Sequence, residues 1–256
     1  MTATPLNVWR ESEGRLLRLR LSRPKANLID AEMIAALDQA FAEHAGSTHL
    51  AAILLDAEGP HFSFGASVEE HLPDQCAAML AGLHRLVLRM VDSPTPVLAA
   101  VRGQCLGGGL EVALAAHMMF VADNAALGQP EMKLGVFAPA ASCLLPELIG
   151  PVRALDLLVS GRSISGAEAA AMGIANAAAA DPEQAALAYI AEHLMPKSAS
   201  SLRFAVQAAR SDYAARVRMK IAAVERLYLD ELMKSRDALE GLQAFLAKRP
   251  AQWEHC

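Results

Sequence analysis

The sequence predicts an α/β protein in which helices pack on a sheet, followed by a helical C-terminal region. In the first half, short apolar runs typical of strands alternate with amphipathic helical patterns at similar spacing. From Pro139 onward, strand patterns are hard to find and helical patterns follow one another. We therefore expect an α/β core with the active site over residues 1–198 and a helical region over residues 199–256.

The composition narrows the class of protein. The chain has 256 residues, 54% of them hydrophobic and 20% charged, which is enough to bury one sizeable core. Its net charge of -5 argues against a basic surface that binds nucleic acid. The longest apolar region, residues 105–122, is interrupted by Glu111 and His117, so it does not predict a membrane span. We expect neither nucleic acid nor a membrane as a partner.

The spacing of the histidines and cysteines predicts whether the protein binds a metal and in which cellular compartment it works. The eight histidines show no metal-ligand spacing, so we expect no metal site. Residues 1–15 lack the apolar core of a secretion signal. The four cysteines lack C-x-x-C spacing and are expected to be reduced thiols of a cytoplasmic protein: Cys76, Cys105, Cys143 and Cys256.

Strand and helix patterns alternate through the first half. Residues 17–21 alternate leucine with arginine, which is the period of a half-buried strand. After a loop, Asp30 is suited to cap a helix. A second helix is expected between Pro73 and Ser93. Continuous apolar runs predict further strands over residues 50–55, 95–101 and 118–122.

Helix signals dominate the second half. Ser165 and Glu168 have the spacing of a capping box. Asp181 followed by Pro182 predicts another helix start, because proline suits the first helical position. Further helical patterns cover residues 200–210, 214–233 and 237–248.

The glycine-rich stretch 107–109 joins the apolar run 95–101 to the helical pattern 110–117. Glycine at such a junction permits a sharp bend and the close approach of a ligand. The free N–H groups at the helix start then favour negative charge. Glu111 follows in the first turn, so an oxyanion-binding turn and a carboxylate lie together. The alternative is a tight strand–helix junction whose glutamate suits the helix dipole.

A second carboxylate follows in the turn that ends with Gln129, Pro130 and Glu131. Pro130 fixes the backbone just ahead of the glutamate. Apolar residues continue to Phe137, and partial burial among them would raise the pKa of Glu131. A raised pKa suits proton transfer near neutral pH. The alternative is an ordinary glutamate at a helix start.

Taken together, these segments resemble the enoyl-CoA hydratase/isomerase family, also called the crotonase family. The likeness covers nearly the whole chain, and the glycine–Glu111 and Gln129-Pro130-Glu131 segments are specific in combination. The resemblance implies a crotonase-like spiral of ββα repeats with a C-terminal helical trimerisation region. It also implies a homo-oligomer, either a trimer or a dimer of trimers. The matching segments are residues 23–27, 62–67, 102–111, 128–131 and 240–249.

The resemblance also implies roles for four residues. The backbone N–H groups of Ala66 and Gly108 would form an oxyanion hole for a thioester carbonyl. Glu111 and Glu131 occupy the two positions that hydratases use as acid and base. Having both favours addition of water to an α,β-unsaturated acyl-CoA, with coenzyme A as part of the substrate and no separate cofactor. The alternatives are a general enoyl-CoA hydratase or isomerase of fatty acid β-oxidation, and a non-catalytic CoA-binding or assembly protein.

Further residues are expected to contact the acyl-CoA. Because the chain is acidic overall, local cations must attract the phosphates of coenzyme A, and Lys25 and Lys248 are the candidates. The alternative for each lysine is a solvated surface charge. Phe245 matches the aromatic contact of the family near the adenine. The full set expected at the substrate is Lys25, Ala26, Phe64, Ser67, Val68, Phe137, Pro139, Phe245 and Lys248.

Two departures from the family pattern indicate an unusual substrate. Ser67 stands where many members have aspartate, and Pro139 stands where a glycine N–H can face the catalytic water. Proline cannot donate that hydrogen bond. The altered segments resemble those of members that hydrate a cyclic dienoyl-CoA in anaerobic benzoyl-CoA degradation. That resemblance implies hydroxide addition at the β-carbon and protonation at the far γ-carbon.

Overall fold

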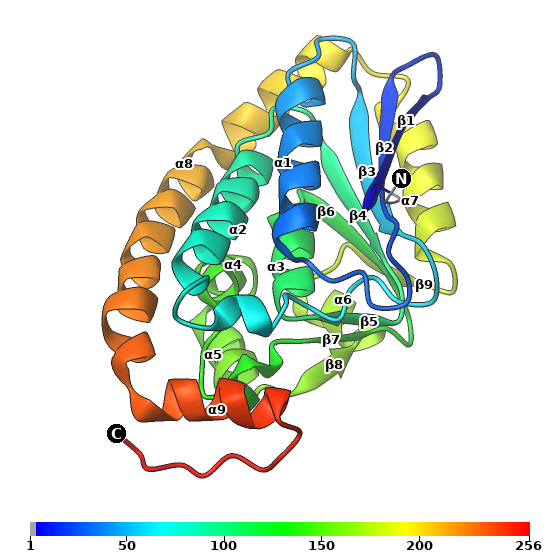
Figure 1. The fold of residues 1–256 in the computed structure, drawn as a ribbon. Helices are drawn as coiled ribbons and strands as arrows, with labels where there is room; N and C mark the ends of the chain where they lie inside the picture. Colours follow the sequence, from blue (N-terminus) through cyan, green and yellow to red (C-terminus); the bar gives the residue numbers. More distant parts are fainter. Residues whose placement is uncertain (1–3) are drawn as a thin grey trace.

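The computed structural model describes residues 4–256 and contains a six-stranded sheet of order β1-β2-β3-β4-β6-β9 (Figure 1). β1 and β2 pair antiparallel, and the other neighbours pair parallel. The four predicted strands are confirmed as β2, β3, β4 and β6, while β1 and β9 are additional. The six strands are Leu6–Glu11, Leu16–Leu21, Ala52–Ala57, Val97–Val101, Met118–Ala122 and Ala177–Ala179.

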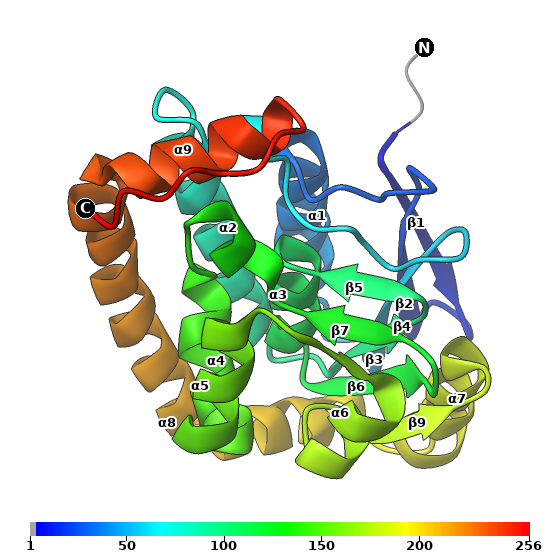
Figure 2. The same cartoon turned by 90° about the horizontal axis from the view of Figure 1, so that it is seen from below.

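A three-stranded sheet of order β5-β7-β8 lies at the end of the molecule where β4 and β6 finish (Figures 1 and 2). Its strands are Gln104–Leu106, Ala126–Gly128 and Ser163–Ser165. Short turns join β4 to β5 and β6 to β7, and helical segments follow each pair. This repeated ββα unit confirms the predicted spiral. In the first of these units, the glycine-rich segment follows β5 and leads into α3.

Three helices of the first half pack together on the large sheet (Figure 1). They are α1 (Ala31–His44), α2 (Cys76–Val91) and α3 (Gly108–Ala115). Asp30 caps α1 as predicted, because its side chain accepts a hydrogen bond from the Met33 N–H at 3.0 Å. α2 begins later than predicted, since the residues just before Cys76 form a turn.

The second half is helical, as predicted, apart from the two short strands β8 and β9. The Ser165 capping box and the Asp181 cap are both present. The run predicted over residues 200–210 and most of the run over 214–233 form a single helix, which ends at Arg226. No glycine or proline separates the two runs. The helices are α4 (Pro139–Ile149), α5 (Pro151–Ser160), α6 (Gly166–Met172), α7 (Pro182–Tyr189), α8 (Ala199–Arg226) and α9 (Arg236–Leu246).

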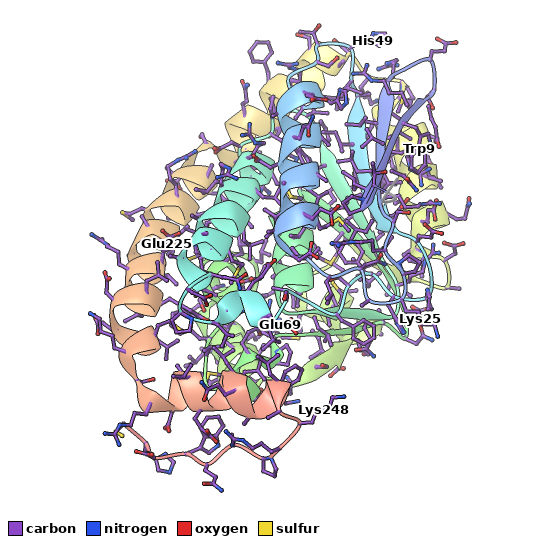
Figure 3. The ribbon with its side chains drawn as sticks, in the orientation of Figure 1. Trp9, Lys25, His49, Glu69, Glu225 and Lys248 are labelled. Atoms are coloured by element: carbon purple, nitrogen blue, oxygen red, sulfur yellow. The ribbon has the colours of Figure 1, made fainter. Side chains whose placement is uncertain are left out.

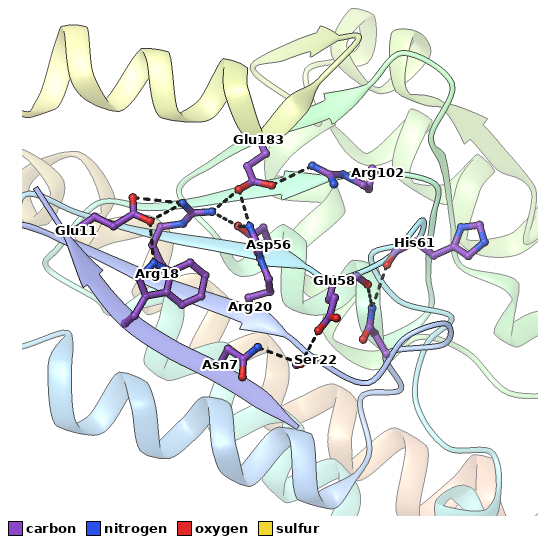
Figure 4. Close-up of polar contacts among 12 residues, drawn as sticks. Asn7, Glu11, Arg18, Arg20, Ser22, Asp56, Glu58, His61, Arg102 and Glu183 are labelled. Carbon is purple, nitrogen blue, oxygen red and sulfur yellow. Dashed lines mark hydrogen bonds and ion pairs between the residues drawn. The ribbon is translucent and has the colours of Figure 1, made fainter. Parts of the chain in front are cut away.

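The arginine face of β2 is covered, contrary to the half-buried strand that the alternation predicts. α7 places Glu183 against Arg18 and Arg20, with N–O distances of 2.6 and 2.5 Å (Figure 4). Buried Asp56 of β3 pairs with the same two arginines. These pairs satisfy charges that would otherwise be costly to bury, so both faces of β2 are covered.

The long helix α8 packs against α2 and α4, and its Val217 and Ile221 belong to the main hydrophobic core. Three of the cysteines are buried and unpaired, and Cys256 is exposed and unpaired. Over residues 4–256, none of the helices has the length and apolar character that a membrane crossing requires. The same residues include no cluster of His, Cys, Asp and Glu that would hold a metal ion.

Candidate active site

A cavity of about 560 Å³ lies among the glycine-rich turn, the 3-10 turn Pro130–Leu134 and helices α2, α4 and α9. Both predicted glutamates and both predicted oxyanion residues line it. Much of the remaining wall is apolar, including Leu80, Leu83, Leu106 and Val136. A larger hollow of about 710 Å³ between α1, α2 and α8 contains none of the four predicted residues. The chemistry therefore places the candidate site in the smaller cavity.

The amides of Ala66 and Gly108 lie close together at the start of α3. A Cβ added to Gly108 would lie 3.2 Å from Ala66 N. Gly107 bends the chain just before the helix with a φ of 49°, which favours glycine. Throughout residues 4–256, neither amide donates a hydrogen bond to another group of the protein. The two N–H groups are therefore free for one oxygen atom at a helix N-terminus.

Glu111 is buried in the first turn of α3. Its Oε1 accepts a hydrogen bond from the Ala141 N–H at 2.9 Å, at the N-terminus of α4. Burial raises the pKa of Glu111, whereas the Ala141 N–H and the nearby His84 oppose that rise. The start of α4 therefore favours the ionised form of this carboxylate.

Glu131 reaches the cavity from the 3-10 turn that Pro130 begins. In the amide orientation that satisfies both groups, Gln129 donates to the Glu131 oxygens at 3.2 and 3.1 Å. A Cβ added to Gly107 would lie 2.6 Å from Glu131 Oε1, so the absence of a side chain there admits the carboxylate. Burial, together with the charge of Glu111, raises the pKa of Glu131 to about 8.

The two carboxyl groups therefore favour a state that holds one proton between them. Each raises the cost of ionising the other, because two negative charges in one poorly solvated cavity repel. Because burial and the charge of Glu111 raise the pKa of Glu131 to about 8, Glu131 is the member that keeps the proton and Glu111 is the ionised one. The arrangement provides a base, an acid and a donor pair for a developing oxyanion.

The predicted substrate contacts fall into two groups. Phe64, Val68, Phe137, Pro139 and Phe245 line the cavity with the four residues above. Lys25, Ala26, Ser67 and Lys248 do not line it. Figure 3 shows Lys25 and Lys248 projecting from the lower part of the molecule, and both are exposed.

Pro139, which stands where a glycine N–H can face the catalytic water in the family, lies at the first position of α4. Proline suits this position because its missing N–H has no partner within the helix. The N–H of Ala141, two residues further on, donates to Glu111 instead. The start of the helix thus supplies a hydrogen bond to the Glu111 carboxylate from a neighbouring residue.

Sequence reasoning did not assign several residues that the structure brings to the site. His71, Lys133 and Arg249 line the cavity. His84 is close enough to Glu111 to oppose the rise of its pKa, and the Nδ1 of His84 is 2.5 Å from Glu225 Oε2 on α8. Arg249 ends the segment 240–249 that resembles the family, and Lys133 lies two residues after the segment 128–131, so the sequence held a signal for both. His71 ends the segment 62–71, which resembles members that hydrate a cyclic dienoyl-CoA, but it was given no role. His84 has no such signal, because its place depends on how the helices pack.

The family model for enoyl-CoA hydratase/isomerase matches residues 11–255, and the chain belongs to this family of acyl-CoA enzymes. It is 62% identical over 253 residues to cyclohexa-1,5-dienecarbonyl-CoA hydratase of Thauera aromatica, covering 99% of this chain and 98% of that relative. Carnitinyl-CoA dehydratase of Proteus mirabilis (strain HI4320) is 32% identical over 256 residues, covering 95% and 96% respectively.

A crystal structure of an enoyl-CoA hydratase from Mycobacterium avium subsp. paratuberculosis K-10 matches with a TM-score of 0.85. The match covers 97% of this chain and 98% of that chain, at 24% identity. This likeness confirms the crotonase fold.

Proposed function

We propose that the chain adds water to cyclohexa-1,5-diene-1-carbonyl-CoA and forms 6-hydroxycyclohex-1-ene-1-carbonyl-CoA, a step of anaerobic benzoyl-CoA degradation. The observation that carries the proposal is the meeting of two carboxyl groups and two free amides in one largely apolar cavity. The 62% identity to the Thauera aromatica enzyme supports the cyclic substrate.

The proposed reaction begins with the thioester oxygen held by the amides of Ala66 and Gly108. Ionised Glu111 removes a proton from water as the oxygen bonds to the β-carbon. The electron pair of the ring double bond moves toward the carbonyl, giving a dienolate whose charge the two amides stabilise. Protonated Glu131 then delivers its proton to the γ-carbon, which leaves a conjugated enoyl thioester. Transfer of the water proton from Glu111 to Glu131 restores the starting state.

Product analysis tests this function. The purified protein is supplied with cyclohexa-1,5-diene-1-carbonyl-CoA or crotonyl-CoA, and the products are identified by mass spectrometry and NMR. We expect faster turnover of the cyclic diene and a hydroxyl group at C6. Faster turnover of crotonyl-CoA would favour a general enoyl-CoA hydratase. Binding of both thioesters without turnover would favour a non-catalytic CoA-binding protein.

We also propose that Lys25 and Lys248 attract the phosphates of coenzyme A. Replacing either with alanine is expected to raise KM about two- to fivefold, the scale of one exposed charge interaction. The effect should be larger at low salt, where charges are less screened. Lys197→Ala, at an exposed lysine between α7 and α8, is the control. An unchanged KM and salt dependence in both variants would contradict the assignment.

The chain is further proposed to assemble as a trimer or a dimer of trimers through its helical C-terminal region, residues 199–256. α8 exposes the large apolar side chains of Phe204 and Met219. Val152, Leu155 and Val159 form a second exposed apolar stripe on one face of α5. Solution scattering at micromolar concentration should give the mass of three or six chains, whereas a monomer would contradict the proposal.

The cytoplasmic location inferred from the cysteines stays a prediction.

A further inference from the structure

We propose that His71 is a positioning residue for the oxyanion hole: its imidazole holds the Ser67 carbonyl and thereby fixes the Ala66 amide beside Gly108. The inference rests on the proposed use of these amides as oxyanion donors. The resemblance gives His71 no role, yet its side chain lines the same cavity as both glutamates.

The ring of His71 is fixed by a short hydrogen bond. His71 ends the 3-10 turn Glu69–His71, and its Nδ1 lies 2.7 Å from the Ser67 carbonyl oxygen. Because a carbonyl only accepts, Nδ1 must carry the proton. Burial lowers the pKa of His71, so the ring is neutral at pH 7 and its Nε2 is unprotonated.

This hydrogen bond completes the attachment of the segment that carries Ala66. On the upstream side, the Gly65 carbonyl accepts from Ile29 N at 2.9 Å, and Gly65 N donates to the Ser63 hydroxyl at 3.1 Å. On the downstream side, the ring of His71 holds the Ser67 carbonyl. The bond from Ile29 therefore holds the peptide group that contains the Ala66 N–H, and His71 holds the chain just after Ala66.

The anchor is itself attached to the body of the protein. Glu70, next to His71, accepts from the Ala31 N–H at the start of α1, with distances of 3.2 and 3.1 Å. The His71 N–H also donates to the Val68 carbonyl at 3.1 Å. The bonds of Glu70 attach the turn to α1 and the bond to Val68 closes the turn itself, so the imidazole is held in place beside the Ser67 carbonyl. Such preorganisation matters because a small displacement of an oxyanion donor costs transition-state stabilisation.

Three substitutions separate this role from a contact between Nε2 and the substrate. His71→Met removes both ring nitrogens and keeps an apolar side chain of similar length. His71→Asn retains an amide N–H near the position of Nδ1, and His71→Gln places its amide near the position of Nε2. His49→Met is the matched control, because exposed His49 also bonds a backbone carbonyl, that of Glu13, far from the cavity (Figure 3).

The readouts are steady-state kinetics and the infrared carbonyl stretch of bound, isotope-labelled cyclohexanecarbonyl-CoA. We expect His71→Met to lower kcat about ten- to hundredfold with KM within about twofold, as for loss of transition-state stabilisation. The carbonyl stretch should shift toward its frequency in free solution, because the carbonyl is less polarised. His71→Asn should restore most of both quantities, and His49→Met should change neither.

A wild-type kcat and carbonyl frequency in His71→Met would overturn the proposal. So would rescue by His71→Gln but not His71→Asn, since that pattern identifies Nε2 as the active group. The saturated thioester cannot be hydrated, so its carbonyl frequency tests His71 even if the cyclic diene proves not to be the substrate.

Discussion

Replacing Glu111 or Glu131 with glutamine is expected to lower kcat for the cyclic diene about a hundredfold or more, the usual scale for loss of acid–base catalysis. Glutamine keeps the shape of glutamate but cannot exchange a proton. Affinity for a non-reactive CoA thioester should change much less. The loss of kcat in the double variant should be far smaller than the two single losses combined, because the two groups act as one unit.

Titration with the non-reactive thioester and the variant Glu192→Gln are the controls for this prediction. Glu192 is exposed, with 76% of its side-chain surface accessible, so its replacement should leave kcat unchanged. A near wild-type rate in either active-site variant would refute the two-glutamate mechanism. The glutamate concerned would then have only a structural role, at the start of its helix or turn.

The pH dependence of the same variants identifies the acid and the base. In the wild type, kcat should fall at low pH when both groups are protonated, and at high pH when both are ionised. Glu131→Gln leaves only the base, so its activity should be lost only as pH falls. Glu111→Gln leaves only the acid, whose pKa drops without the neighbouring charge. Its alkaline loss should therefore begin at a lower pH than in the wild type.

The local parts of the site could be predicted because adjacent residues determine them. The positive φ of Gly107 requires glycine, and Pro130 at the start of its turn directs Glu131. The approach of Ala66 to Gly108 was implied only by the resemblance, because it depends on tertiary packing. The influence of His84 on Glu111 likewise requires α2 and α3 to be packed together.

The same distinction explains the elements that sequence patterns missed. β9 consists of Ala177–Ala179, which has little β-propensity and forms a strand because it pairs with β6. α4 begins at Pro139 and carries Pro146 in its interior. Its buried residues fall in two runs, Pro139–Ala141 and Cys143–Leu145. The alternation of apolar and polar residues typical of an amphipathic helix is therefore weak. Its helix start, which donates to Glu111, was therefore not predicted.

Substituting Gly108 with alanine tests the oxyanion hole while leaving both glutamates in place. The added Cβ would lie 3.2 Å from Ala66 N and also 3.2 Å from Ala66 Cβ, so the two donors must move apart or be obstructed. We expect kcat to fall about a hundred- to a thousandfold, as for loss of one oxyanion donor. Stability should not fall in parallel, because alanine favours a helix more than glycine does.

The control for this substitution is Gly46→Ala, because a Cβ at Gly46 meets no atom within 4 Å. It should retain wild-type kcat and thermal midpoint. In Gly108→Ala, the carbonyl stretch of a bound saturated thioester should also move toward its frequency in free solution, since polarisation requires both amides. Loss of kcat with an unchanged carbonyl frequency would point to displaced glutamates instead. Wild-type values of both quantities would show that the Gly108 amide does not bind the thioester oxygen, because a hydrogen bond that stabilises the dienolate must also polarise the bound carbonyl.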